Sequence, residues 1–197
     1  MKILGAVVGA VALLAVGLAV WAVGSYNGLV GLNENASRAW AQVESQYQRR
    51  LDLVPNLVET VKGSAKFEKD TLTAVVDARA RAGSITLDKG ALNDPASFKK
   101  FEDAQAGLSS ALSRLMVVVE KYPDIKSTEA FRDLTVQLEG TENRIQVARK
   151  DFNEAAQGYN TAIKAFPGAL VAGFGGFKER PYFQAAPAAA QAPAVKF

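Results

Sequence analysis

The chain has 197 residues, 22% of them charged, which fits one ordinary hydrophobic core with additional segments and argues against a disordered chain. It contains no cysteine and no histidine, which excludes disulfides, thiolate nucleophiles, lipidation on a cysteine and the commonest metal ligand. The net charge of +3 is small and basic residues alternate with acidic ones, so we expect no nucleic-acid partner.

Residues 1–26 form the predicted transmembrane anchor. Residues 3–24 carry no charge, and about 22 residues at 1.5 Å each give roughly 33 Å of helix, which matches the hydrocarbon core of a bilayer. A cleaved signal peptide is the alternative, because Lys2 precedes the apolar run and Ala22 and Gly24 have the spacing that a signal peptidase prefers. The apolar run exceeds the usual length of a signal peptide's hydrophobic region, which favours the anchor.

Aromatic and small residues of this segment suggest how it sits in a membrane. Trp21 and Tyr26 lie at its outer end, where aromatic rings favour the headgroup level. Gly5 and Gly9 form a G-x-x-x-G pair, continued by Gly17, which would allow a second such helix to approach closely. The positive charge ahead of the apolar run favours a cytoplasmic amino terminus, and therefore a body outside the cytoplasm.

Residues 27–166 show helical periodicity almost throughout and no sustained alternation of period two, which predicts an all-α body. The first helix continues outward from the membrane segment. One apolar row steps by seven along it, through Tyr26, Asn33, Trp40, Tyr47, Val54 and Val61. A second row lies three positions further on and contains Leu29, Ala36, Val43 and Leu57, with Arg50 as the exception.

Pro55 lies inside this apolar pattern, although proline lacks the N–H that a helix interior needs. Asp52 could cap a new helix and place Pro55 in its first turn, or one long helix could kink at Pro55. The kink is the preferred interpretation. The charged residues around the proline, Arg50 included, are interpreted as a solvated face.

Three further helices are predicted in the body. The second runs from about Lys66 to Ala82. Asp94 followed by Pro95 is the start signal of the third, which ends at Tyr122. The fourth covers about 127–166, with a large residue at every seventh position: Phe131, Leu138, Ile145, Phe152, Tyr159 and Phe166. Small residues between these suit close antiparallel packing, so we expect a long up-down bundle of about four helices whose last helix returns to the membrane.

Residues 167–183 are rich in glycine and aromatic residues. Beside the bilayer, Phe174, Phe177, Tyr182 and Phe183 would be interfacial anchors or subunit contacts. A glycine-rich loop folded onto its own bundle is an equal alternative. Residues 184–197 are rich in alanine and proline and are predicted to form a disordered tail.

Four stretches carry a family resemblance: YNGLVGLNENASRAWAQVESQYQRRLDLVPNLVETVKG, VVDARARA, TENRIQVARKDFNEAAQGYN and FPGALVAGFGGFKERPYF. They resemble the LemA family of bacterial single-span membrane proteins. The resemblance implies an amino-terminal anchor and a helical bundle. It brings no established reaction, and some family members are associated with organising internal membranes.

No motif with catalytic chemistry stands out. The stretch GFGGFK lacks the spacing of a phosphate-binding loop, and Ser97 with Lys100 matches S-x-x-K without its companion motifs. We therefore expect no enzyme activity, no cofactor and no metal site.

Two functional hypotheses remain. The first is a non-catalytic, self-associating scaffold in the bacterial inner membrane that organises or remodels the bilayer. The alternative is an adaptor or accessory subunit that binds another membrane protein, such as a protease or a sensor.

Overall fold

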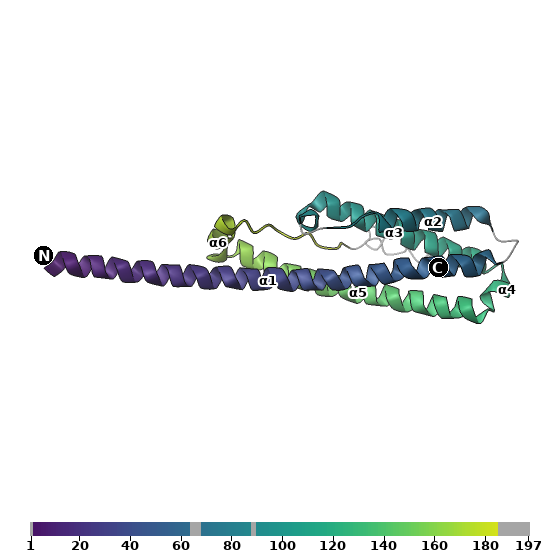
Figure 1. Ribbon diagram of the computed structural model, residues 1–197, viewed down its shortest axis with the longest axis horizontal. Coiled ribbons are helices and arrows are strands. Elements are labelled where there is room, and N and C mark those ends of the chain that lie inside the picture. Colours follow the sequence, from purple (N-terminus) through teal and green to yellow (C-terminus); the bar gives the residue numbers. More distant parts are fainter. Residues whose placement is uncertain (1, 64–67, 88–89, 185–197) are drawn as a thin grey trace, which may run out of the picture.

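The computed structural model describes residues 2–63, 68–87 and 90–184, and within these ranges it contains helices and no strand. The elements are α1 (Lys2–Lys62), α2 (Lys69–Gly83), the 3-10 turn η1 (Ala91–Asn93), α3 (Pro95–Val119), α4 (Pro123–Lys126), α5 (Glu129–Lys164) and α6 (Gly168–Gly175). The long helices α1, α2, α3 and α5 run alternately up and down (Figure 1). The predicted all-α, antiparallel bundle is confirmed. The predicted tail lies outside the described residues from 185 onward.

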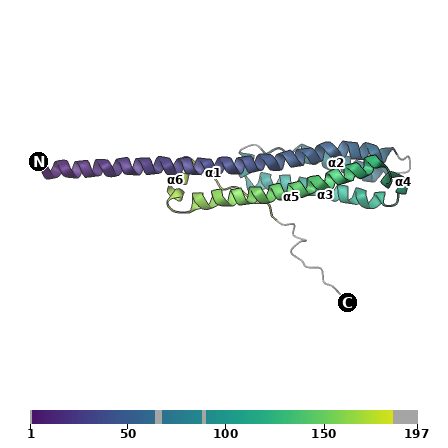
Figure 2. The same ribbon diagram turned by 90° about the horizontal axis from the view of Figure 1, so that it is seen from below.

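α1 is a single helix of 61 residues, which at 1.5 Å per residue is about 90 Å long. Its first part projects beyond the bundle, and its large apolar side chains from Ile3 to Val23 are exposed (Figures 1 and 2). From Leu29 onward one face of the same helix is buried. The boundary between the predicted anchor and the predicted body is therefore a change of surroundings along one helix, with no break in the backbone.

The predicted apolar rows form the core. Both rows of α1 are buried from Leu29 to Val61 apart from Asn33, which is half-buried, and Arg50 is buried with them. The row of α5 is buried from Phe131 to Tyr159, but Phe166 is exposed, which corrects the prediction. The reason is that α5 ends at Lys164, so Phe166 lies in the turn that follows.

Helix ends follow the capping chemistry of the sequence. The Asp94 side chain accepts hydrogen bonds from the backbone N–H groups of Ala96 and Ser97, as expected of the residue before Pro95. The fourth predicted helix is α5, and Thr128 caps its start by accepting from the N–H of Phe131 at 3.3 Å. The short α4 precedes it, between the third and fourth predicted helices.

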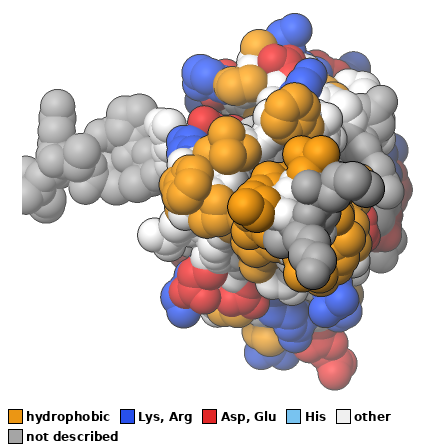
Figure 3. Space-filling view, turned by 90° about the vertical axis from the view of Figure 1, so that its left-hand side faces the viewer, with side chains coloured by type: hydrophobic (Ala, Val, Ile, Leu, Met, Phe, Trp, Pro, Cys, Tyr) orange, Lys and Arg blue, Asp and Glu red, His pale blue; other side chains and the backbone are white. Residues whose placement is uncertain are grey.

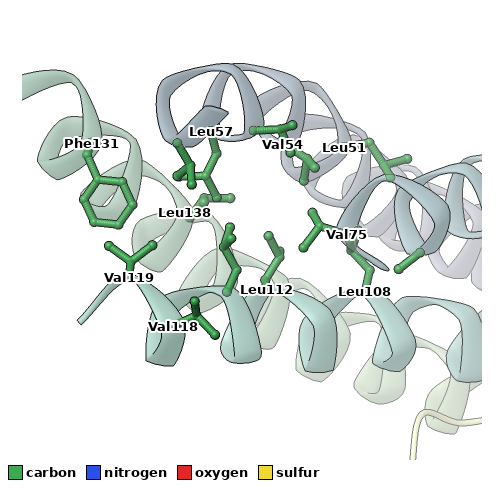
Figure 4. Packing of buried hydrophobic residues seen from close by; sticks show 14 of the residues in the cluster. Leu51, Val54, Leu57, Val75, Leu108, Leu112, Val118, Val119, Phe131 and Leu138 are labelled. Carbon is green, nitrogen blue, oxygen red and sulfur yellow. The ribbon is translucent and has the colours of Figure 1, made fainter. Parts of the chain in front are cut away.

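The buried side chains form three apolar clusters in series along α1. The distal cluster, farthest from the projecting end, joins all four long helices; its members in Figure 4 include Leu51, Val54, Leu57, Val75, Leu108, Leu112, Val118, Val119, Phe131 and Leu138. The aromatic cluster follows and contains Trp40, Val43, Tyr47, Phe98, Phe101, Phe152 and Phe183 among others. The proximal cluster, next to the projecting part of α1, is built on Leu29, Tyr159, Ile163 and Ala172.

Pro55 lies inside α1, which continues past it, so Asp52 does not cap a new helix there. The missing proline N–H frees the carbonyl of Leu51, four residues back. The Nε of Arg79 in α2 donates a hydrogen bond to this carbonyl at 3.0 Å. A neighbouring helix thus replaces the donor that proline lacks. A kink at Pro55 stays a prediction.

We expect Arg79→Ala to lower the free energy of unfolding by about 1–2 kcal/mol, because the half-buried Leu51 carbonyl loses a charged donor. In a Pro55→Ala background the same substitution should cost clearly less, since alanine has the backbone N–H that proline lacks and can donate it to that carbonyl. Chemical denaturation of the detergent-solubilised protein, followed by circular dichroism, measures both. Arg81→Ala, at an exposed position of α2, is the control. Equal costs in the two backgrounds would contradict this account of the proline.

Candidate functional site: the strap groove and the proximal end of the bundle

The strap is the extended segment 177–184, which leaves α6 and runs back along the bundle (Figure 1). Asn160 of α5 donates to the carbonyl of Arg180 at 2.8 Å and accepts from its N–H at 2.9 Å. Asn153 makes the same pair of bonds with Phe183, both at 2.9 Å. Asn153 and Asn160 are seven residues apart, which is a rise of about 10.5 Å along α5. Arg180 and Phe183 are three residues apart, which is about 9 Å of extended chain. Because the two spacings are similar, each asparagine can bond to one of the two strap residues.

Aromatic and basic side chains hold the two ends of the strap. The Tyr159 hydroxyl donates to the carbonyl of Lys178 at 2.9 Å, and the Nη2 of Arg149 donates to that of Gln184 at 3.1 Å. The Phe183 ring lies 4.8 Å from the Phe98 ring, within the aromatic cluster, and the Arg149 guanidinium covers it at 4.5 Å. Phe183 is therefore a core residue, and its assignment to the membrane interface is wrong.

A buried guanidinium anchors the middle of the strap. Arg180 is 5% exposed, and its Nη2 donates to Asn33 Oδ1 at 2.9 Å and to Ser37 Oγ at 2.8 Å, both on α1. Burial lowers the pKa of Arg180, and the neighbouring Tyr159 opposes this. Together with buried Asn160, Arg180 forms a polar layer between the aromatic and proximal clusters.

A second polar layer separates the aromatic and distal clusters. Arg50 is 3% exposed; its Nη1 donates to Ser109 Oγ at 2.8 Å and to Glu142 Oε2 at 3.1 Å, and its Nη2 donates to Gln105 Oε1. Burial lowers the pKa of Arg50, and Glu142 opposes this. The assignment of Arg50 to a solvated face is wrong. Its position in an apolar row, with Gln105 in the corresponding row of α3, was the signal for a buried polar contact.

An open cleft of about 980 Å³ lies over this layer, between α3 and the strap. Two of its charged pairs join different helices: Arg149 lies 3.5 Å from Glu102, and Arg50 contacts Glu142. Burial raises the pKa of Glu102, and the Gln184 N–H and Arg149 oppose this. Within residues 2–63, 68–87 and 90–184, no three Asp or Glu side chains gather as a metal ion would require.

The proximal end of the bundle joins α6 to α1. Ala172 of α6 packs in the proximal cluster, and the Phe177 ring meets the Tyr26 ring edge-on at 5.4 Å. A Cβ on Gly168 would lie 2.3 Å from the Ala162 carbonyl oxygen, so only glycine permits this approach. Hydrophobic side chains gather at this end, with charged side chains towards its rim (Figure 3).

The four residues predicted to face the interface have different surroundings. Phe174 is 96% exposed at the proximal end, Phe177 is half-buried against Tyr26, and Phe183 is in the core. Tyr182 is partly exposed and lies beside α5, away from α6. Two residues that the sequence did not single out for the interface, Phe166 and Leu170, are exposed near Phe174 in the chain.

The projecting part of α1 has the properties of a membrane span. Among the described helices it is the one long and apolar enough to cross a membrane, with a mean hydropathy of 2.4 and no buried residue in that stretch. Trp21 and Tyr26 lie at its outer end and are each partly exposed. A Cβ on Gly9 or Gly17 would have open space around it, and Gly5 lies in the same helix.

These features define a class of protein: an all-α bundle carried on one apolar helix that is long enough to span a membrane. The chain belongs to the LemA family, whose profile matches residues 39–197. This agrees with the resemblance carried by the four sequence stretches.

The chain is also similar to individual relatives. It is 32% identical over 179 residues to magnetosome protein MamQ 2 of Paramagnetospirillum magneticum and 31% identical over 181 residues to magnetosome protein MamQ of Magnetospirillum gryphiswaldense. Each match covers 83% of this chain and 66% of the relative, so the chain spans just under two thirds of their length. Protein LemA of Metamycoplasma hominis is 23% identical over 144 residues, covering 73% of this chain and 62% of that protein.

We expect Asn160→Ala to lower the free energy of unfolding by about 2 kcal/mol, because it leaves the buried N–H and carbonyl of Arg180 without partners. Cleavage by trypsin after Lys178 should also become faster as the strap loosens. Asn143→Ala, at an exposed position of the same helix, is the control and should change neither measurement. Unchanged cleavage in Asn160→Ala would show that the asparagine does not hold the strap.

Gln105→Leu should lower the free energy of unfolding by about 3 kcal/mol, because Arg50 keeps its buried charge and loses a partner. The double variant Arg50→Leu/Gln105→Leu should recover most of this loss, since no buried charge remains. Glu142→Gln, at a half-exposed partner, should cost less than Gln105→Leu. Denaturant titration of all three variants measures the differences. If the double variant is no more stable than Gln105→Leu, the buried charge of Arg50 is not the cause of the loss in stability.

Proposed function

We propose that this protein is a non-catalytic scaffold of the bacterial inner membrane, which self-associates and organises or remodels the bilayer. The observation that carries the proposal is the continuity of α1, which passes from the apolar span into the bundle without a break. A continuous helix transmits orientation, so each copy would hold its bundle at the same height and angle to the membrane. Copies in one bilayer would then hold the same surfaces at the same level above it.

The open face of α1 supports lateral association. Gly17, Gly24 and Gly31 are spaced by seven, and Gly28 lies on the same side of the helix. A Cβ on any of the four would have open space around it, and the contacts of α1 with its own bundle lie on the opposite side, beginning at Leu29. Small residues on an open face allow two membrane helices to approach closely.

The family supports the membrane role. The MamQ relatives are named magnetosome proteins, and some members of the LemA family are associated with organising internal membranes. The family's name and the names of these relatives mention no reaction. We also propose that the bundle lies outside the cytoplasm, because the charge of Lys2 favours a cytoplasmic amino terminus.

An adaptor that binds another membrane protein is the second candidate. The open cleft between α3 and the strap favours it, because this concave surface lies well away from the anchor and is lined by both charged and aromatic side chains. In this case the bundle would be a rigid support that holds the cleft above the membrane.

The full-length protein extracted in mild detergent should have a mass several times that of the 21.0 kDa chain. Gly17→Ile/Gly24→Ile should reduce that mass, because bulky side chains on the open face prevent close approach. Ala15→Ile, about 200° away around the helix, is the control and should leave the mass unchanged. Light scattering during size-exclusion chromatography gives these masses. A monomeric wild-type protein would contradict the scaffold, and a monomer that grows only when a partner is added would support the adaptor.

A further inference from the structure

An uncharged, apolar surface covers the outer side of α6 and the turn before it. No charged residue occurs between Lys164 and Lys178. Leu170 and Phe174 lie four residues apart, so they share one face of α6, and they are 55% and 96% exposed. Phe166, in the preceding turn, is 83% exposed. We call these three side chains the α6 face. A water-facing surface rarely concentrates such large, exposed apolar side chains.

The α6 face lies at the level where α1 would leave the bilayer. The unbroken apolar run of α1 ends at Gly24, before the polar residues Ser25 and Asn27. Ala172 of α6 shares the proximal cluster with Leu29 of α1, and Phe177, just after α6, meets the Tyr26 ring. Two to five residues of helix correspond to about 3–8 Å along the axis of α1. The headgroup region on each side of a bilayer is about 5–8 Å deep. The aromatic residues Trp21 and Tyr26 mark the same level independently.

The bundle holds α6 in place from its inner side. Ala172 is buried in the proximal cluster, and Val171 packs against it. A Cβ on Gly175 would lie 2.6 Å from the Phe177 ring and 3.2 Å from the Tyr26 ring, so glycine allows both rings to close over this end of α6. The α6 face is therefore presented by a packed helix and needs no unfolding to become available.

We propose that the α6 face inserts into the lipid leaflet at the point where α1 leaves it, so that the protein contacts the bilayer twice. The partner is the boundary between headgroups and acyl chains. Lipid is favoured over a second protein because the face carries no charge or hydrogen-bonding side chain to orient a partner, and because it adjoins a helix already suited to lipid.

A second contact would fix how the bundle is turned about the axis of α1. A single span leaves that rotation free, whereas an inserted face on one side of α1 does not. It would also displace lipid on that side only. The proposal rests on the membrane anchoring in the proposed function and adds the surface through which the body acts on the bilayer.

The absence of cysteine allows a direct test with single-cysteine variants of the full-length protein. Leu170→Cys and Phe174→Cys are labelled with bimane, and Val136→Cys and Val147→Cys, at exposed apolar positions of α5, are the matched controls. The proteins are reconstituted in vesicles of phosphatidylcholine and phosphatidylglycerol that carry nitroxide on the acyl chains. Quenching at positions 170 and 174 should be at least about threefold stronger than at the controls, because the interface places a side chain 5–10 Å into the lipid.

Quenching at position 174 no stronger than at position 147 would overturn the proposal. Disulfide-linked dimers through position 174 without quenching by lipid would also overturn it, because a second copy would then cover the α6 face. The mass measured in detergent is a separate result: a monomer whose position 174 is quenched refutes the scaffold and supports the α6 insertion.

Discussion

One constraint governs this molecule: α1 has to suit two solvents in a single helix. Over its first part every large apolar side chain is exposed, and from Leu29 onward one face is buried against α5 and α2. A lipid span needs apolar residues all round, whereas a bundle helix needs them on one face. The change of pattern occurs near Tyr26 without a break in the backbone. The other helices and the strap pack where the side chains of α1 form a buried face.

Polar layers at two levels divide the core of the bundle. Arg50 joins α1 to α3 and α5, and Arg180 joins the strap to α1. Each guanidinium is buried, so it stabilises the fold only where its partners are correctly placed. An apolar seam with a repeat of seven would tolerate sliding of one helix along another by one repeat. These two layers oppose such a slip, because a shifted helix would leave a buried charge unpaired.

The segment after α5 has two parts with opposite surroundings. α6 turns a face of large apolar side chains outward, and the strap inserts Phe183 into the aromatic cluster. Gly176, with a φ of 69°, separates them, because few residues with a side chain adopt that conformation. The strap then ties the proximal end to the middle of the bundle through Asn160 and Asn153. A short segment rich in glycine and aromatic residues therefore links the surface nearest the membrane to the core.

The sequence by itself determined the helices and the core rows, because the period of apolar residues reports which face of a helix is buried. It also predicted the Asp94 cap and the length of the apolar span, which depend on local chemistry alone. Tertiary structure decided the rest. Arg50 is locally one charge among others, and its burial depends on Gln105 and Glu142, far away in the chain. Phe174 and Phe183 lie in one stretch rich in glycine and aromatic residues, and their opposite surroundings depend on whether a groove between other helices receives each ring.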